Sequence, residues 1–431
     1  MLKTFQYRLY PTKHQETILN SQLEECRWLY NHFLEERKTT YEKTKKSPGL
    51  FDQCLTLPKL KSQWGSLKTV HSQVLQNVAM RIDLAFQAFF RRCKNGEKPG
   101  YPRFKGLDRY DSMTFTQIPV GCEIRDEILK ISKVGNIKII LHRPLEGKPK
   151  ICTIKRSSTG KWYAYFSCEI PTLNILPNNK RKIGIDVGLT TFATLSNEES
   201  IPNPRFFRKD EKELVKAQRK LSKEEKGTPE RIKRRKPISR IHERIGFRRK
   251  NFAHQESRKI VNRFSFIAIE DLEINRMIHN RCLAKSISDA AWSLFFTLLF
   301  VKAVEAGRTI VKVNPSYTSQ TCYACGHRQK MPLSKRTFLC PCCKFETDRD
   351  HNAACNILRL GLQSVGPIPK SPQSSDWGSS HMNPTLIQTP ISQPNMPERY
   401  QTFPCTSPCP ENIRAQDQHG QRYHLASTTQ W

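Results

Sequence analysis

Residues 182–189 read Lys-Ile-Gly-Ile-Asp-Val-Gly-Leu, a stretch that predicts a buried strand broken by glycines and ending in a carboxylate, Asp186. A second strand is predicted at 264–270, where one serine is the only polar residue before the terminal acid, Glu270. Helical patterns alternate with these strands along the chain. From residue 182 onward we therefore expect a mixed α/β core.

A third acid, Asp350, stands where a helix is expected to begin. A carboxylate at the end of an apolar strand is costly to desolvate unless a cation meets it. Three such groups would raise each other's pKa values unless divalent metal intervened. Together Asp186, Glu270 and Asp350 fit two-metal phosphodiester hydrolysis, in which Mg²⁺ ions ~4 Å apart activate water and stabilise the leaving oxygen. Singly, each acid is also explained as a turn residue or a helix N-terminal acid.

Two CxxC pairs form a candidate metal site, with fourteen residues between the pairs: Cys322-Tyr-Ala-Cys325 and Cys340-Pro-Cys-Cys343. Two tight turns of this kind can close a tetrahedron of sulfur around Zn²⁺ and leave no open position for catalysis. A redox CxxC is the alternative. Cys342 leaves the second pair ambiguous, because it could replace either neighbour. The motif predicts structural zinc without naming a function.

The charge of the chain points to a polyanionic partner. Lys and Arg total 72 against 39 acidic residues, a formal net charge of +33, and this excess lies in residues 1–363. Nucleic acid is the favoured partner and an anionic membrane surface the alternative. The most apolar run, 290–301, is shorter than the ~20 residues of a membrane span. We expect a cytoplasmic, nucleoid-associated protein with reduced cysteines and no signal peptide.

The residue composition and the pattern of apolar residues change twice along the chain. Residues 1–170 alternate short strand patterns with a helical stretch, which predicts a β-barrel or sandwich interrupted by a helical insert. Residues 208–260 are intensely basic and helical, with interruptions expected at Gly227 and Pro237. After about residue 366 the composition turns to Pro, Ser, Gln and Thr, which predicts disorder.

Basic residues in two segments are candidates for nucleic-acid contact. One segment is an aromatic loop near residue 103, and the other is the basic helical region. The alternatives are a packed loop and a solvated helix face. The candidates are Arg103, Lys105, Arg234, Arg235, Arg240, Arg244, Arg248 and Arg249.

Seven ordered motifs together resemble one family, the transposon-encoded RNA-guided nucleases called TnpB or OrfB, which are regarded as ancestral to type V CRISPR effectors. The resemblance covers roughly residues 1–363. The motifs are Tyr7-Arg-Leu-Tyr-Pro-Thr12, Arg27-Trp-Leu-Tyr-Asn31, Gly184-Ile-Asp-Val-Gly-Leu189, Ile267-Ala-Ile-Glu-Asp-Leu272, Lys285-Ser-Ile-Ser-Asp-Ala-Ala-Trp292, Tyr317-Thr-Ser-Gln-Thr-Cys322 and Asp348-Arg-Asp-His-Asn-Ala-Ala354.

The resemblance implies a multidomain α+β fold. It places a wedge β-barrel at 1–175 with a helical recognition insert at about 13–95, and an RNase-H-like (RuvC) nuclease domain at 176–363. A four-cysteine zinc ribbon at 314–347 would be inserted in the nuclease domain. The remainder, 364–431, falls outside the match and is the tail predicted to be disordered.

The resemblance also implies a chemistry. Asp186, Glu270 and Asp350 would be the catalytic acids of a DNA endonuclease with two Mg²⁺ and one structural Zn²⁺. A guide RNA from the transposon end would pair with target double-stranded DNA beside a short target-adjacent motif. Asp271 and Asp348 rank as structural neighbours of the acids. Lys344, where the family usually has glycine, could alter the second cysteine turn.

Two other functions remain open at this point. A nuclease-inactive relative would bind RNA and DNA as a regulator, but the three intact acids argue against it. A strand-transfer transposase would act on element ends without RNA. The ribbon inserted before Asp350 and the basic helical region favour a guided nuclease instead.

Overall fold

The computed structural model describes residues 2–107, 109–170, 175–332 and 335–365. The chain separates into two compact units, Met1–Ile368 and Pro369–Trp431, and all the described residues belong to the first. Of the tail predicted to be disordered, residues 364 and 365 end the last helix, and the rest lies outside the described residues.

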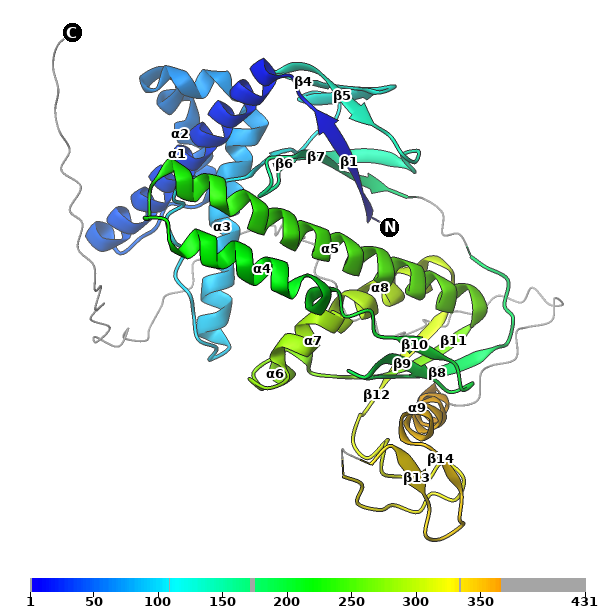
Figure 1. Ribbon diagram of the computed structural model, residues 1–431. Helices are drawn as coiled ribbons and strands as arrows, with labels where there is room; N and C mark the ends of the chain where they lie inside the picture. Colours follow the sequence, from blue (N-terminus) through cyan, green and yellow to red (C-terminus); the bar gives the residue numbers. More distant parts are fainter. Residues whose placement is uncertain (1, 108, 171–174, 333–334, 366–431) are drawn as a thin grey trace. The chain divides into compact units, whose positions relative to one another are not determined.

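A seven-stranded antiparallel sheet curls into a nearly closed barrel (Figure 1), which confirms the predicted β-barrel. Alternate residues of its long first strand, among them Phe5, Tyr7 and Leu9, are fully buried, because one face of the strand lies on the core. In hydrogen-bonded order the strands are β2 (Ser112–Phe115), β6 (Lys148–Arg156), β7 (Trp162–Glu169), β1 (Leu2–Tyr10), β5 (Gly135–Ile140), β4 (Ile128–Ile131) and β3 (Cys122–Arg125).

Helices occupy the chain between β1 and β2. The first is capped by Thr12, whose hydroxyl accepts the N–H of Gln15 while the Gln15 side chain accepts the N–H of Thr12. The apolar faces of these helices share one buried core with the inward side chains of the barrel. The helices are α1 (Lys13–Thr44), α2 (Leu50–Gln63), a short 3₁₀ helix (Gly65–Thr69) and α3 (Ser72–Lys94).

The second sheet is mixed and has five strands, which confirms the α/β core expected from residue 182 onward. Its order is β10-β9-β8-β11-β12, with β8, β11 and β12 parallel and β9 antiparallel to both of its neighbours. The strands are β8 (Lys182–Val187), β9 (Thr191–Leu195), β10 (Ser200–Pro202), β11 (Phe266–Glu270) and β12 (Thr309–Val313).

Helices cover both faces of this sheet. Ile267 and Ile269 of β11 face a core that includes α5 (Pro229–Arg263) and α8 (Trp292–Glu305). Phe266 and Ala268 face the opposite core, where α9 (Arg349–Val365) packs. Burial on both faces explains why β11 is apolar along its length up to the acid.

Glycines allow α9 to pack directly on the backbone of the sheet. A methyl group at Gly184 of β8 would lie 2.1 Å from the carbonyl oxygen of Ala354 in α9. A methyl group at Gly361 would lie 2.6 Å from Cβ of Ala268 in β11. The body of α9 is therefore held against the strands that carry two of the acids.

The basic helical region consists of α4 (Phe206–Ser222) and α5, joined by a turn in which Gly227 has φ of +98°. The expected interruption at Pro237 is wrong, because α5 continues through this residue. Pro237 removes a single backbone donor at an exposed position. Apolar residues that follow it, Ile241 and Ile245, pack against α4 and hold the helix together.

One described segment, 284–305, is long and apolar enough to cross a membrane by length and composition, with a mean hydropathy of 1.5 over its best window. Half of that window is buried within the protein. Ala291, in a left-handed conformation with φ of 57°, divides the segment into α7 (Ala284–Ala290) and α8. The buried face of α8 belongs to the core under the five-stranded sheet, which accounts for its apolar character.

Candidate active site

Two of the three acids lie at neighbouring strand ends. β8 and β11 run parallel with Ile185 opposite Ile269, so Asp186 and Glu270, one residue further, reach the same edge of the sheet. The hydroxyl of Thr318, on the loop after β12, donates to Glu270 Oε1 at 2.6 Å. Burial raises the pKa of Glu270, and this hydrogen bond partly opposes the shift.

The third acid, Asp350, lies in the first turn of α9. Asp348 caps this helix, because its Oδ1 accepts the N–H of Asp350 at 2.8 Å and that of His351 at 3.1 Å. A methyl group at Gly188, just after β8, would lie 4.0 Å from Asp350 Oδ2, so the start of α9 faces the end of β8. Burial and Asp348 raise the pKa of Asp350, while Arg336, 3.5 Å from Oδ2, opposes the shift.

Of the three acids, Asp186 is the one whose pKa its surroundings raise most. Burial raises its pKa well above the usual value, and the charges of Glu270 and Asp350 raise it further. The structure therefore brings together the three acids singled out in the sequence. A bound divalent cation would relieve their repulsion, so the donor set fits Mg²⁺, which prefers carboxylate oxygens.

The four cysteines form a much tighter cluster. Sγ of Cys322 lies 3.7 Å from Sγ of Cys343, and Sγ of Cys325 lies 3.5 Å from Sγ of Cys340. Tetrahedral Zn–S bonds of ~2.3 Å would separate the sulfurs by about 3.8 Å. Among the described residues, only these four bring three or more candidate ligand atoms within 4.8 Å of one another. Cys342 is not one of the four, so the geometry favours Cys343 as the second ligand of this pair.

The two cysteine turns have matching backbone hydrogen bonds. The N–H of Gly326 donates to the carbonyl of Cys322, and the N–H of Lys344 donates to that of Cys340. Both residues are left-handed, with φ of 79° for Gly326 and 61° for Lys344. The lysine therefore preserves the turn, but it places a side chain in a conformation that favours glycine.

Two buried asparagines of α9 form hydrogen bonds to residues 318–323, the segment that includes the first cysteine ligand, Cys322. Nδ2 of Asn352 donates to the carbonyl of Thr321 at 2.8 Å, and its Oδ1 accepts the N–H of Tyr323 at 2.9 Å. Nδ2 of Asn356 donates to the carbonyls of Thr318 at 2.9 Å and Thr321 at 2.6 Å. Sequence reasoning missed these asparagines and Thr318. The four-residue spacing of Asn352 and Asn356, which places both on one face of α9, was the available signal.

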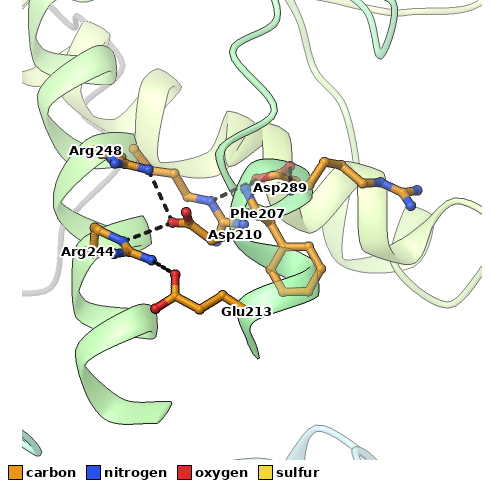
Figure 2. A network of polar contacts seen from close by, with 8 residues as sticks. Phe207, Asp210, Glu213, Arg244, Arg248 and Asp289 are labelled. Carbon is orange, nitrogen blue, oxygen red and sulfur yellow. Dashed lines mark hydrogen bonds and ion pairs between the residues drawn. The ribbon is translucent and has the colours of Figure 1, made fainter. Parts of the chain in front are cut away.

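Two residues predicted to contact nucleic acid, Arg244 and Arg248, form ion pairs with acids of α4, while their side chains stay 40% and 44% exposed. Arg244 Nε and Arg248 Nη1 each lie 3.2 Å from Asp210 Oδ2, and Arg244 also pairs with Glu213 (Figure 2). Asp210 is buried on α4, and both arginines come from α5. These contacts join the two helices, so Arg244 and Arg248 help to hold α5 against α4.

Arg249 is also engaged within the protein. Its Nη2 lies 2.8 Å from Oδ1 of Asp289, a buried acid on α7. Asp289 also accepts the N–H of Phe207 at 2.8 Å and so caps α4 (Figure 2). The sequence offered no sign of this contact, because the partners are forty residues apart.

The other predicted contacts differ in their surroundings. Lys105 is anchored to α1, because Asn31 bonds both its N–H and its carbonyl and its ammonium lies 5.4 Å from the ring of Tyr30. Arg234 lies 3.2 Å from Glu224 at an exposed position. The remaining three are exposed side chains: Arg103, Arg235 and Arg240.

Comparison with known proteins defines the class to which this fold and site belong. Three family models match successive parts of the chain: "Helix-turn-helix domain" at 1–46, "Probable transposase" of the OrfB type at 165–281, and "Cas12f1-like, TNB domain" at 292–357. A Streptomyces pristinaespiralis protein named "Putative RNA-guided DNA endonuclease" is 34% identical over 373 residues, which cover 84% of this chain and 89% of the relative. The chain therefore belongs to the OrfB (TnpB) family, as the motifs indicated.

Two further relatives extend the comparison. The Escherichia coli protein named "Putative RNA-guided DNA endonuclease InsQ" is 28% identical over 402 residues, covering 86% of this chain and 97% of the relative. The "CRISPR-associated endodeoxyribonuclease Cas12f1" of Sulfoacidibacillus thermotolerans is 29% identical over 253 residues, covering 54% of this chain and 58% of the relative. Both names describe enzymes that act on DNA.

Proposed function

We propose that this chain is an RNA-guided, Mg²⁺-dependent DNA endonuclease encoded by an insertion sequence. The observation that carries the proposal is the meeting of Asp186, Glu270 and Asp350 at one edge of the five-stranded sheet. Membership of a family whose relatives are named RNA-guided DNA endonucleases supports it. The net charge of +33 suits a protein that holds two polyanions.

In the proposed mechanism Asp186, Glu270 and Asp350 are the metal-holding acids of an RNase-H-like (RuvC) site. When bound, two Mg²⁺ would supply the charge that activates water and stabilises the leaving oxygen. Asp186 and Glu270 approach from adjacent strands, and the cap by Asp348 directs the first turn of α9 so that Asp350 faces them. No separate protein base is invoked.

The partners follow from the same proposal. A guide RNA derived from the transposon end would pair with one strand of target double-stranded DNA, next to a short target-adjacent motif. The barrel and its helices, at about 1–175, would hold the duplex, and 176–363 would cut it. Arg103, Arg235 and Arg240, all exposed, are the best remaining contacts of the predicted set. We place the protein at the nucleoid.

The cysteine cluster is proposed to hold one structural Zn²⁺ in a ribbon at 314–347. Four thiolates with this spacing suit zinc and leave no open coordination position. The carboxylates, which are less tightly gathered, suit the harder Mg²⁺. The two sites would therefore select different metals.

One experiment tests the proposed function. The protein is purified from cells that carry its element, the co-purifying RNA is sequenced, and matching duplex DNA is offered with Mg²⁺. We expect cleavage that needs both the RNA and Mg²⁺ and falls at least about a thousandfold in Asp186→Ala. Gly246→Ala serves as the control for folding and purification, because nothing lies within 4 Å of its methyl position.

Two other results would redirect the proposal. RNA-dependent binding without cleavage by the unsubstituted protein would select the nuclease-inactive regulator. Joining of element ends without RNA would select a strand-transfer transposase, the function named by the family model at 165–281.

A further inference from the structure

We propose that Thr318 is a positioning residue of the carboxylate site and that, through it, the four-cysteine domain sets the affinity of Glu270 for a divalent cation. This inference rests on the proposed function, because it takes Glu270 as a metal-holding acid. Thr318 is buried, at 4% exposure, and its Oγ1 lies 2.6 Å from Glu270 Oε1. That distance is typical of a hydroxyl that donates to a charged carboxylate.

The hydroxyl of Thr318 has one proton and two acceptors within reach. The carbonyl oxygen of Pro315 lies 3.1 Å away, farther than the carboxylate oxygen of Glu270. The nearer and charged acceptor takes the proton. A carboxylate held at one oxygen cannot rotate freely, so its other oxygen keeps a fixed direction and remains available to a cation.

Thr318 itself is held by α9. Its carbonyl accepts Nδ2 of Asn356 at 2.9 Å, and the same amide donates to Thr321 at 2.6 Å. Asn356 is 1% exposed, so these bonds are made away from water. The position of the Thr318 backbone is therefore fixed relative to α9, which carries Asp350 in its first turn.

The cysteine domain enters at the same segment. Tyr323, which lies between the ligand cysteines Cys322 and Cys325, donates its N–H to Asn352 of α9 at 2.9 Å. Residues 318–323 thus include the sulfur ligand Cys322, bond to the helix that carries Asp350, and contact the carboxylate of Glu270. The arrangement of the cysteine cluster therefore influences the position of the Glu270 carboxylate through the hydroxyl of Thr318.

The test measures cation binding directly. Mn²⁺ serves as the probe for the Mg²⁺ site, and the full-length protein with its co-purified RNA is titrated while bound Mn²⁺ is followed by electron paramagnetic resonance. An Asp186→Asn/Glu270→Gln double variant provides the blank for Mn²⁺ held by RNA. Thr318→Val is expected to weaken the protein-specific binding roughly tenfold, the lower end of the effect of losing a partner of a metal ligand.

Two variants serve as controls. Thr318→Ser retains the hydroxyl and is expected to bind within about twofold of the unsubstituted protein. Thr321→Val removes a nearby hydroxyl that bonds only the carbonyl of Tyr317 among the described contacts, at 3.0 Å. It is expected to leave Mn²⁺ binding unchanged. Zinc content and melting temperature are measured for each variant.

The outcomes separate the two proposals. If the unsubstituted protein binds no more Mn²⁺ than the double variant, the proposed function fails. If it binds more, but Thr318→Val binds equally well, only the role of Thr318 is overturned. Should Thr318→Val lose zinc or fail to fold, Thr318→Cys keeps the volume and weakens the donor, and unaltered Mn²⁺ binding there overturns the inference.

Discussion

The four-cysteine cluster and the three-carboxylate cluster are built in opposite ways. All four thiols fall within residues 322–343, on two turns whose backbone hydrogen bonds match. The carboxylates of Asp186, Glu270 and Asp350 are gathered by the register of parallel strands and by the packing of α9. A soft-metal site can therefore be encoded locally, whereas the acid site depends on the whole domain.

The electrostatics of the two clusters differ for the same reason. In the second cysteine turn, the N–H groups of Cys343 and Cys342 lower the pKa of Cys340 to about 6. At the end of β8, burial and the charges of Glu270 and Asp350 raise the pKa of Asp186 well above its usual value, although the N–H of Val187 opposes the shift. The same turn does not prepare every thiol: the N–H of Phe345 lowers the pKa of Cys343, but burial and the neighbouring thiols raise it to about 12. Cys340 is therefore the thiol that its own turn favours as a thiolate, and the acids remain destabilised without a cation.

Removal of zinc is the largest perturbation that distinguishes the two clusters. The cysteine domain has a core of only a few side chains around Phe338, so the metal must supply most of its stability. Structural Zn²⁺ contributes about 10 kcal/mol in small zinc domains. A chelator that strips zinc is expected to abolish amide protection at 337–348 while β8 and β11 stay protected, as measured by hydrogen exchange. Unchanged protection of 337–348 in zinc-free protein would contradict this.

The carboxylate cluster is expected to fail instead through the packing of α9. In Gly184→Ala the new methyl group would meet backbone atoms of α9 at 2.1 and 2.7 Å, which cannot move independently of the helix. We expect a loss of roughly 1–3 kcal/mol in the free energy of unfolding, measured by denaturant titration, together with lost cleavage. Gly246→Ala is the matched control, because nothing lies within 4 Å of its methyl position in α5. It is expected to stabilise the helix slightly.

The pH dependence of the acid site gives a smaller effect of known sign. A carboxyl whose pKa is raised by folding binds more protons in the native state, so its ionisation costs stability as the pH rises from the unfolded pKa through the folded value. Asp186→Asn removes that cost. In Mg²⁺-free protein it is expected to raise the melting temperature by a few degrees at pH 7–8.

That gain should vanish at about pH 3, where Asp186 is almost fully protonated in both the folded and the unfolded states. Added Mg²⁺ should also reduce it, because the cation favours the ionised acid. A gain of equal size at both pH values would show that repulsion is not its cause. Scanning calorimetry at the two pH values makes the comparison.

The smallest predicted effect compares the two cysteine turns with each other. Lys344→Gly relieves a left-handed side-chain residue and is expected to stabilise the metal-bound domain by roughly 1 kcal/mol. Gly326→Ala imposes the same strain on the first turn and is expected to cost a similar amount. Competition with a zinc chelator measures both. If the two variants bind zinc with equal affinity, left-handed strain does not have the same effect in the two cysteine turns.

Much of the fold followed from periodicity and composition. The alternation along β1 and the apolar run before Glu270 predicted a β-barrel or sandwich and a mixed sheet, because burial on one face or on two leaves different patterns. Pro237 was misread as a break, since its tolerance depends on packing between α5 and α4. The arginines of α5 were read as one basic set. Only the tertiary structure shows that Arg244 and Arg248 pair with an acid of α4 and Arg249 with an acid of α7.

The sequence by itself determined the two sets of candidate ligands. It also determined the cysteine turns, because short spacings and left-handed positions act within a few residues. Tertiary structure alone decided that Asp186, Glu270 and Asp350 meet, and that Thr318 reaches Glu270. It also decided which arginines remain exposed. These contacts join residues tens to more than a hundred positions apart, and they form because both faces of one sheet must be buried.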